Sequence, residues 1–337
     1  MQNILFINSL IFVFVINLLF LKNKLFSSYS GEKHQTLAGK KNIPLSGGIF
    51  VFLFISVFLL QSFNYVIFLI FLLGFVTDIK LLISPKIRII LQAILLYGFV
   101  HFTELHIQST RIIFLDELLK ISFIGFLFTG FCLIVVMNGT NFIDGLNGLV
   151  LGYYLSIILI IFNLGLFESL NLDLHLIIYS IIFLTFLFLL NIFNQLYLGD
   201  SGSYLLSLTV CFILVKIYNG NQNISPFFIV LLLWYPAFEN LFSILRKFVF
   251  KVSPAVADRY HLHQLIFVFI KKNTLYKNNT NNLSSFIIIS YNAIIFLIAS
   301  LHAENTQYQI FLIIFNLVFY IFLYSKIFFS LKLASKN

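Results

Sequence analysis

Residues 138–148, with the sequence NGTNFIDGLNG, hold three glycines and four amide or carboxylate side chains within eleven residues. Glycines let backbone N–H groups approach a phosphate closely, and carboxylate and amide oxygens are ligands that Mg²⁺ accepts. Asn141, Asp144 and Asn147 are therefore candidate metal or phosphate ligands. The alternative is an ordinary polar turn that caps two helices.

A second cluster, Gly199-Asp200-Ser201-Gly202-Ser203, directly precedes an apolar run. The N-terminus of a helix presents free N–H groups that bind anions, and a neighbouring carboxylate can hold the metal that bridges to the anion. Asp200 is the candidate metal ligand here. The plainer reading is that Asp200 and the serines only cap the helix.

The third cluster, residues 258–264, contains Arg259, His261 and His263 in the longest and most basic loop. Two histidines separated by one residue do not have the spacing of a helical zinc site, and no cysteine lies close by. An arginine and two histidines suit the neutralisation of a phosphate better. The alternative is a basic loop attracted to lipid head groups.

Weaker signals surround Asp78, which ends an apolar run and is followed by Lys80, Lys86 and Arg88. Two further segments belong with them, Lys33-His34 and residues 44–48 with Gly47 and Gly48. An ionised carboxylate beside the hydrocarbon is costly to insert, so Asp78 is expected to have a partner or a chemical role.

The elements that carry these clusters must be membrane helices. The 337-residue chain is 60% hydrophobic and only 10% charged, whereas soluble domains carry about a quarter charged residues. The net charge of +9 is attributed to loop lysines that orient helices and contact anionic lipid rather than to nucleic-acid binding. We expect an all-α integral membrane protein with about eleven spans in a single domain, residues 1–337.

The apolar runs indicate where these spans lie, and several are shorter than the ~20 residues of a perpendicular crossing, so their helices must extend into the adjoining loops. The runs are Ile4–Leu21, Ile49–Leu60, Tyr65–Val76, Ile87–Phe102, Ile121–Met137, Leu149–Phe167, Leu174–Leu190, Tyr204–Ile217, Pro226–Phe238, Phe286–Ala303 and Ile310–Phe329. A long loop is expected at about residues 239–285.

Charge sets the orientation. With about eleven spans, all but Arg111, Lys120 and Lys216 of the 21 lysines and arginines fall on one side, which the positive-inside rule makes cytoplasmic. The N-terminus is then outside and the C-terminus inside. All the polar clusters described above lie in loops on that cytoplasmic side, which indicates one site for a metal-bound, di-anionic substrate and a partner presented from the bilayer.

These motifs resemble those of the polyprenyl-phosphate N-acetylhexosamine-1-phosphate transferases, the glycosyltransferase family 4 that also contains phospho-MurNAc-pentapeptide translocase. Residues 141–149 resemble the family pattern NxxDGLDGL, residues 199–203 resemble GDxGS, and residues 239–263 resemble the stretch that ends in DRxHLHH. The resemblance runs from Lys33 to His263. The sugar-phosphate branch fits better than the pentapeptide branch.

The resemblance implies a reaction in the bacterial cytoplasmic (inner) membrane, with the active site facing the cytoplasm. A sugar-1-phosphate, most commonly GlcNAc-1-phosphate, passes from a UDP-sugar to undecaprenyl phosphate, and UMP is released. The product initiates a lipid-linked cell-surface glycan of the cell wall or O-antigen type. Mg²⁺, with Mn²⁺ as the alternative, is the implied cofactor, and a homodimer is left open.

Carried over by position, Asp200 is implied as the main metal ligand, with Asn141 or Asp144 nearby. Asn147 faces the nucleotide, and Arg259, His261 and His263 engage phosphates or shape the donor site. Lys86 contacts the diphosphate. Asp78 lies beside the attacking lipid phosphate.

Three features depart from the family pattern, and one is that the Pro-Ala often found before the GD motif is missing around Asn194. Thr77 precedes Asp78 where two adjacent aspartates are usual, and Gln264 follows His263 where another histidine is usual. Because of these departures, a catalytically impaired member of the family is one alternative. A transporter or scaffold with the same topology is another. Transporters place ionisable residues in mid-span, whereas here they lie at span ends. The pentapeptide translocase is the enzymatic alternative.

Overall fold

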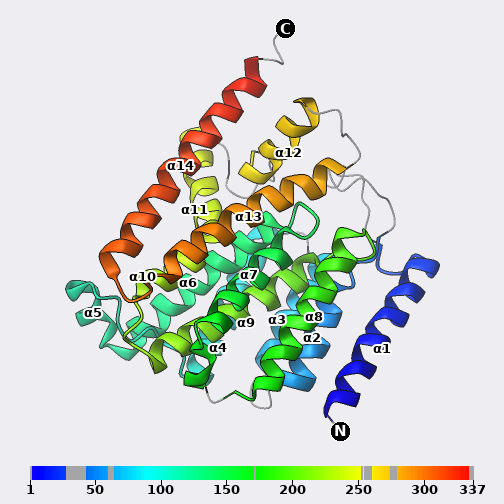
Figure 1. The fold of residues 1–337 in the computed structure, drawn as a ribbon, viewed down its shortest axis with the longest axis horizontal. Coiled ribbons are helices and arrows are strands. Elements are labelled where there is room, and N and C mark those ends of the chain that lie inside the picture. The colour runs from blue at the N-terminus through cyan, green and yellow to red at the C-terminus, as the bar shows by residue number, and fades with distance from the viewer. Residues whose placement is uncertain are drawn as a thin grey trace.

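The computed structural model describes residues 2–27, 43–59, 64–82, 84–170, 172–251, 253, 260–273 and 279–333. Within these ranges the regular structure is all helical, with no strand, as expected (Figure 1). The α-helices are α1 (Gln2–Asn23), α2 (Gly47–Phe54), α3 (Asn64–Asp78), α4 (Pro85–Phe102), α5 (Ile113–Leu119), α6 (Ser122–Ile143), α7 (Leu149–Asn163), α8 (Leu174–Ile192), α9 (Gly199–Gly220), α10 (Pro226–Leu232), α11 (Trp234–Val249), α12 (Leu262–Asn273), α13 (Thr280–Ser300) and α14 (Thr306–Leu333). A π-helix (Ile55–Leu59) extends α2, and a 3₁₀ helix (Leu166–Leu170) follows α7.

Seven of the described helices are long and apolar enough to cross a bilayer: α1, α4, α6, α8, α9, α13 and α14. They are not equally buried. In its apolar window α9 has 72% of its residues buried inside the protein, whereas α1 has 17%. Helix α9 is therefore the central helix of the bundle, and α1 lies at its edge, where lipid can cover most of its side chains.

The helices extend further than the apolar runs. Helix α6 continues to Ile143, so Asn138 and Asn141 occupy its last turns, and α9 begins at Gly199, so Asp200 occupies its first turn. Because a helix satisfies its own backbone hydrogen bonds both inside and outside the hydrocarbon, it can continue past the point where polar side chains begin. The polar motifs are consequently held by rigid helix ends as well as by loops.

The expected span Pro226–Phe238 is not one straight helix, which corrects the sequence prediction. Helices α10 and α11 meet at Leu233 and are bent by 72° relative to each other. Pro236 explains the break, because a proline lacks the N–H group and its ring clashes with the carbonyl four residues earlier, here that of Leu232. Leu232 is the last residue of α10.

The segment 239–285, predicted as a long loop, contains most of α11, all of α12 and the start of α13. Helix α11 buries Glu239, Ser243 and Arg246 while Leu245 and Phe248 are exposed. Its polar face thus points into the protein and its apolar face points outward. Hydropathy alone misses such a helix, because alternating polar and apolar faces lower its average hydrophobicity.

Three short connections bring helix ends together. Helix α3 is joined to α4, α6 to α7, and α8 to α9, each within a few residues. Pro85 starts α4 and Gly148, with φ of +76°, precedes α7. In Figure 1 the N-terminus and the C-terminus lie at opposite ends of the helix bundle.

Candidate active site

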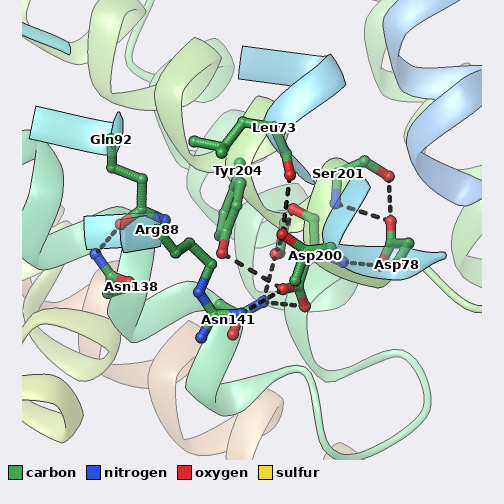
Figure 2. A network of polar contacts seen from close by, with 11 residues as sticks. Leu73, Asp78, Arg88, Gln92, Asn138, Asn141, Asp200, Ser201 and Tyr204 are labelled. Atoms are coloured by element: carbon green, nitrogen blue, oxygen red, sulfur yellow. Dashed lines mark hydrogen bonds and ion pairs between the residues drawn. The ribbon is translucent and has the colours of Figure 1, made fainter. Parts of the chain in front are cut away.

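The N-terminus of α9 is held by Asp78, the last residue of α3. One carboxylate oxygen of Asp78 accepts the backbone N–H of Asp200 at 2.7 Å, and the other accepts the N–H and the hydroxyl of Ser201 at 3.1 and 2.6 Å. Figure 2 shows Asp78 facing this first turn. A negative charge at a helix N-terminus is favourable, because unpaired N–H groups and the helix dipole meet there.

Two glycines bring neighbouring helices against the same turn. A Cβ atom on Gly48 would lie 2.0 Å from the hydroxyl oxygen of Ser201, and one on Gly74 would lie 2.3 Å from the Cα atom of Ser201. Helices α2 and α3 therefore pack directly on α9 where Asp200 begins. The close packing leaves Asp200 little freedom to move.

The carboxylate of Asp200 is the centre of a polar network (Figure 2). Asn141 donates to one oxygen through Nδ2 at 2.6 Å, and Arg88 donates to the other through Nη1 at 2.9 Å. The hydroxyl of Tyr204 lies 3.4 Å from the same oxygen as Arg88. The Arg88 and Asp200 side chains are each 23% exposed, so the network reaches solvent.

The network continues between α4 and α6. Asn138 donates to the side-chain oxygen of Gln92 at 2.9 Å, as Figure 2 shows. Within the described part of the chain, Nε2 of Gln92 and Nε of Arg88 are buried without a hydrogen-bond partner. Unsatisfied buried donors are costly, so they indicate a place where a substrate oxygen or water completes the network.

Asp144 follows α6 directly and lies close to the start of α9. Desolvation, followed by the charges of Asp200 and Asp78, raises the pKa of Asp144 well above its ordinary value. The backbone N–H of Gly199 opposes this shift. The charges of Asp200 and Asp78 disfavour the ionised form of Asp144, and a cation bound between these carboxylates would offset their repulsion.

Asparagines hold the loop between α6 and α7. Asn147 is buried; its N–H donates to Asn281 at 2.8 Å and its Nδ2 donates to Asn194 at 2.8 Å. The N–H of Gly148 donates to Asn191. Asn147 was predicted to face a nucleotide, and in the structure its amide nitrogen joins this loop to the connection between α8 and α9.

The two histidines lie beside that loop. The ring centroid of His261 is 5.1 Å from that of Phe142, which neighbours Asn141. A Cβ atom on Gly145 would lie 2.6 Å from Nε2 of His263. His263 is fully buried, and desolvation lowers its pKa to about 3. A neutral His263 adds no charge to this site.

Of the predicted site residues, the structure gathers Asp78, Asn141, Asp144 and Asp200 at one place, with His261 and His263 next to the same loop. Lys86 is exposed on the first turn of α4. Arg259 and the Lys33-His34 pair lie outside the described residues. The contact with Asp200 is made by Arg88 and not by Lys86. The sequence indicated Arg88 only through its position two residues after Lys86, at the start of a predicted helix.

The residue types around Asp200 are ones that a magnesium ion accepts as ligands. Carboxylate and amide oxygens suit a hard cation, and Asp200, Asn141 and Asp144 supply them. Among the described residues no group of three His, Cys, Asp or Glu side chains forms a complete metal site. An ion held here would consequently share its coordination with amide groups, water or substrate phosphates, as Mg²⁺ commonly does.

Comparison with known proteins shows which proteins this chain resembles. The model of glycosyl transferase family 4 matches residues 60–218. The chain is 27% identical to an undecaprenyl-phosphate alpha-N-acetylglucosaminyl 1-phosphate transferase of Salmonella typhi over 87% of this chain and 81% of that protein. That match covers 159 of the 337 residues, so the chain resembles this family over somewhat less than half of its length.

Other relatives of similar likeness carry the same activity in their names. The undecaprenyl-phosphate alpha-N-acetylglucosaminyl 1-phosphate transferase of Yersinia pestis is 28% identical over 78% of this chain and 74% of that protein. A probable undecaprenyl-phosphate N-acetylglucosaminyl 1-phosphate transferase of Bacillus subtilis is 26% identical over 68% of this chain and 67% of that protein. The family 4 match includes Asp78, Arg88, Asn141, Asp144 and Asp200.

Proposed function

We propose that the protein transfers N-acetylglucosamine-1-phosphate, or a related N-acetylhexosamine-1-phosphate, from a UDP-sugar to undecaprenyl phosphate. The names of the relatives support both the sugar phosphate and the lipid acceptor. The observation that carries the proposal is the contact of Asp200 with Arg88 and Asn141 at the meeting point of α4, α6 and α9.

The reaction exchanges one phosphoric anhydride for another. An oxygen of the lipid phosphate attacks the β-phosphorus of the UDP-sugar, the bond between the β-phosphorus and the bridging oxygen breaks, and UMP leaves with that oxygen. The lipid phosphate is already largely ionised near pH 7, because its second pKa is about 6 by analogy with phosphorylated side chains. The enzyme has mainly to bring two anions together and to stabilise their charge.

The residues at the start of α9 suit that task. Arg88 carries a permanent positive charge in a planar, five-donor group that matches phosphate oxygens. Asp200, Asn141 and Asp144 would hold Mg²⁺, which when bound screens the diphosphate and stabilises the leaving phosphate. Asp78 keeps Asp200 in place through the backbone. Lys86 lies about half a turn before Arg88 on the exposed side of α4, where it can meet a diphosphate.

We also propose that the chain crosses the membrane eleven times. The seven long helices, the bent α10–α11 pair and the three shorter apolar helices α2, α3 and α7 make up this number. The N-terminus is then outside and the C-terminus in the cytoplasm, in agreement with the separation of basic residues. The active site faces the cytoplasm, where nucleotide sugars are found.

Transfer is tested with purified protein, Mg²⁺, undecaprenyl phosphate and a panel of radiolabelled UDP-amino sugars. We expect label in the lipid phase with UDP-GlcNAc or a closely related donor, together with an equal amount of UMP. Label from none of the donors would overturn the proposed activity. Label from UDP-MurNAc-pentapeptide alone would identify the pentapeptide branch instead.

Topology is tested with single cysteines at positions 144 and 200 in a variant without Cys132 and Cys211. Both cysteines should react with an impermeant maleimide only in inside-out vesicles. Labelling of the two positions from opposite sides would exclude a common site.

A further inference from the structure

Glu239 is a buried carboxylate that the reaction described above does not use. It lies on the inward face of α11 and is 1% exposed. A buried carboxylate is retained only where donors replace its water. Three donors surround it: Nδ1 of His261 at 2.9 Å, the N–H of Leu262 at 3.3 Å and the hydroxyl of Tyr320 at 2.8 Å.

Tyr320 brings the C-terminal helix to this cluster. It lies on α14, 81 residues from Glu239, and is 1% exposed. The rings of Phe238 and Phe242 pack against it edge to face, at centroid distances of 4.9 and 5.2 Å. This packing holds the Tyr320 ring, and its hydroxyl donates to Glu239.

The contact with Glu239 determines the state of the His261 ring. A carboxylate only accepts hydrogen bonds, so Nδ1 of His261 must carry the proton in this contact. The ring is also held between Phe142 at 5.1 Å and His263 at 5.8 Å, measured between ring centroids. The contact with Glu239 therefore fixes both the orientation and the tautomer of the ring.

The position of the ring connects this cluster to the transfer site. Phe142 follows Asn141 in the last turn of α6, and Asn141 donates to Asp200. A shift or flip of His261 would therefore change the surface that adjoins the Asp200 network. Tyr320 and His261 both donate hydrogen bonds to Glu239, and these two bonds connect α14 to that surface.

We propose that Glu239 and Tyr320 are positioning residues for the transfer, with Glu239 fixing the orientation and tautomer of His261 and Tyr320 fixing Glu239. The inference rests on the proposed function for its catalytic meaning. Helix α14 then supports the site through Glu239, and like Glu239 and His261 it lies outside the residues that match the family model. The ligand that His261 meets is a phosphate group of the nucleotide sugar.

The test uses the full-length protein with Glu239→Gln and Tyr320→Phe. The first variant keeps the size of the side chain and removes its charge, and the second removes one oxygen. We expect Glu239→Gln to lower kcat by about 10- to 100-fold, as loss of a group that orients a catalytic side chain does. Tyr320→Phe should lower kcat by about 2- to 10-fold, the value of one hydrogen bond.

Tyr291→Phe is the matched control, because Tyr291 also donates a hydrogen bond to α14, at Asn316, away from Glu239. It should leave kcat and KM unchanged. A structural role for Glu239 is separated from a positioning role by repeating Glu239→Gln in a His261→Gln background. There it should change kcat by less than about 3-fold, since the two residues act as one unit. Equal losses in both backgrounds would overturn the proposal.

The ¹⁵N chemical shifts of the His261 ring give a readout that does not depend on turnover, with His261→Gln used for assignment. The wild type should show the proton on Nδ1, and Glu239→Gln should show a mixture of tautomers. An unchanged tautomer in Glu239→Gln overturns the proposal even if activity falls. If the wild type transfers no sugar phosphate to lipid, the proposed function fails, and the spectra still decide whether Glu239 positions His261.

Discussion

The guanidinium group of Arg88 lies 2.9 Å from the carboxylate of Asp200, although 112 residues separate them in the chain. Helices α4 and α9 each contribute one member of this pair, and Asn141 on α6 contributes the second partner of the carboxylate. A cation, a carboxylate and an amide thus meet at the ends of three helices. This arrangement supplies the first two predictions.

Asp200→Asn should abolish transfer while the protein still inserts and folds. The amide keeps the volume and one accepting oxygen but removes the charge that a hard cation requires. Incorporation of label into lipid is expected to fall by more than about 100-fold, the scale of a lost charge-stabilising group. Thermal melting in detergent serves as the folding control. Activity equal to wild type would exclude Asp200 as the metal ligand.

Arg88→Gln should lower transfer more than Lys86→Gln. Arg88 contacts Asp200 in the interior of the site, whereas Lys86 is exposed one half-turn earlier on α4. Removing a partly buried cation that contacts Asp200 should reduce the transfer rate more than removing a solvated cation. Steady-state kinetics with UDP-GlcNAc give the comparison. A larger loss in Lys86→Gln would place the diphosphate on the outer side of α4.

Gly48→Ala should destabilise the protein and displace the first turn of α9, because the new Cβ would lie 2.0 Å from the Ser201 hydroxyl. Overpacking of this kind costs about 1–3 kcal/mol or more. Gly130→Ala on α6 is the matched control, since its Cβ would meet no atom within 4 Å. The melting temperature should fall for Gly48→Ala and stay level or rise for Gly130→Ala, where alanine favours the helix. The same response in both would argue against close packing at Ser201.

His263 makes stability depend on pH. Its pKa is about 3 in the folded protein and ordinarily 6.5, so above pH 6.5 the histidine is neutral in both the folded and unfolded states. Below pH 6.5 only the unfolded chain gains the proton, and stability falls by about 1.4 kcal/mol for each pH unit. Melting curves between pH 8 and 5 measure this slope. His263→Gln should make it shallower by about that amount, and an unchanged slope would contradict the buried, neutral state.

Thr77→Asp should leave the rate unchanged or raise it. The Thr77 hydroxyl donates to the carbonyl of Leu73 in its own helix at 2.9 Å and not to the Asp200 network. An aspartate there restores the pair of carboxylates found in the patterns that this chain resembles. Initial rates at several pH values check the effect. A large drop would mean that the extra negative charge repels the lipid phosphate.

Much of this protein could be predicted from local sequence. Each apolar run is mostly helical wherever the structure describes it, because a helix is how a backbone satisfies its own hydrogen bonds in hydrocarbon. The polar clusters around Asn141 and Asp200 were expected to converge, and they do. The glycines beside Asp144 and Asp200 also signalled backbone positions that side chains would obstruct.

Other features depend on contacts between distant residues and were not predictable in this way. Hydropathy averages over a window, so it missed the inward polar face of α11 and the break at Leu233. Arg88 rather than Lys86 contacts Asp200 because of the way α4 is rotated about its axis against α9. The sequence at the start of α4 does not reveal this rotation. The link from Tyr320 through Glu239 to His261 joins three separate elements.

The sequence by itself therefore determined the helices, their apolar character and the residue types available for chemistry, since these follow from each segment's own backbone and side chains. The tertiary structure decided which of those residues meet, because pairing across more than a hundred residues depends on packing between helices.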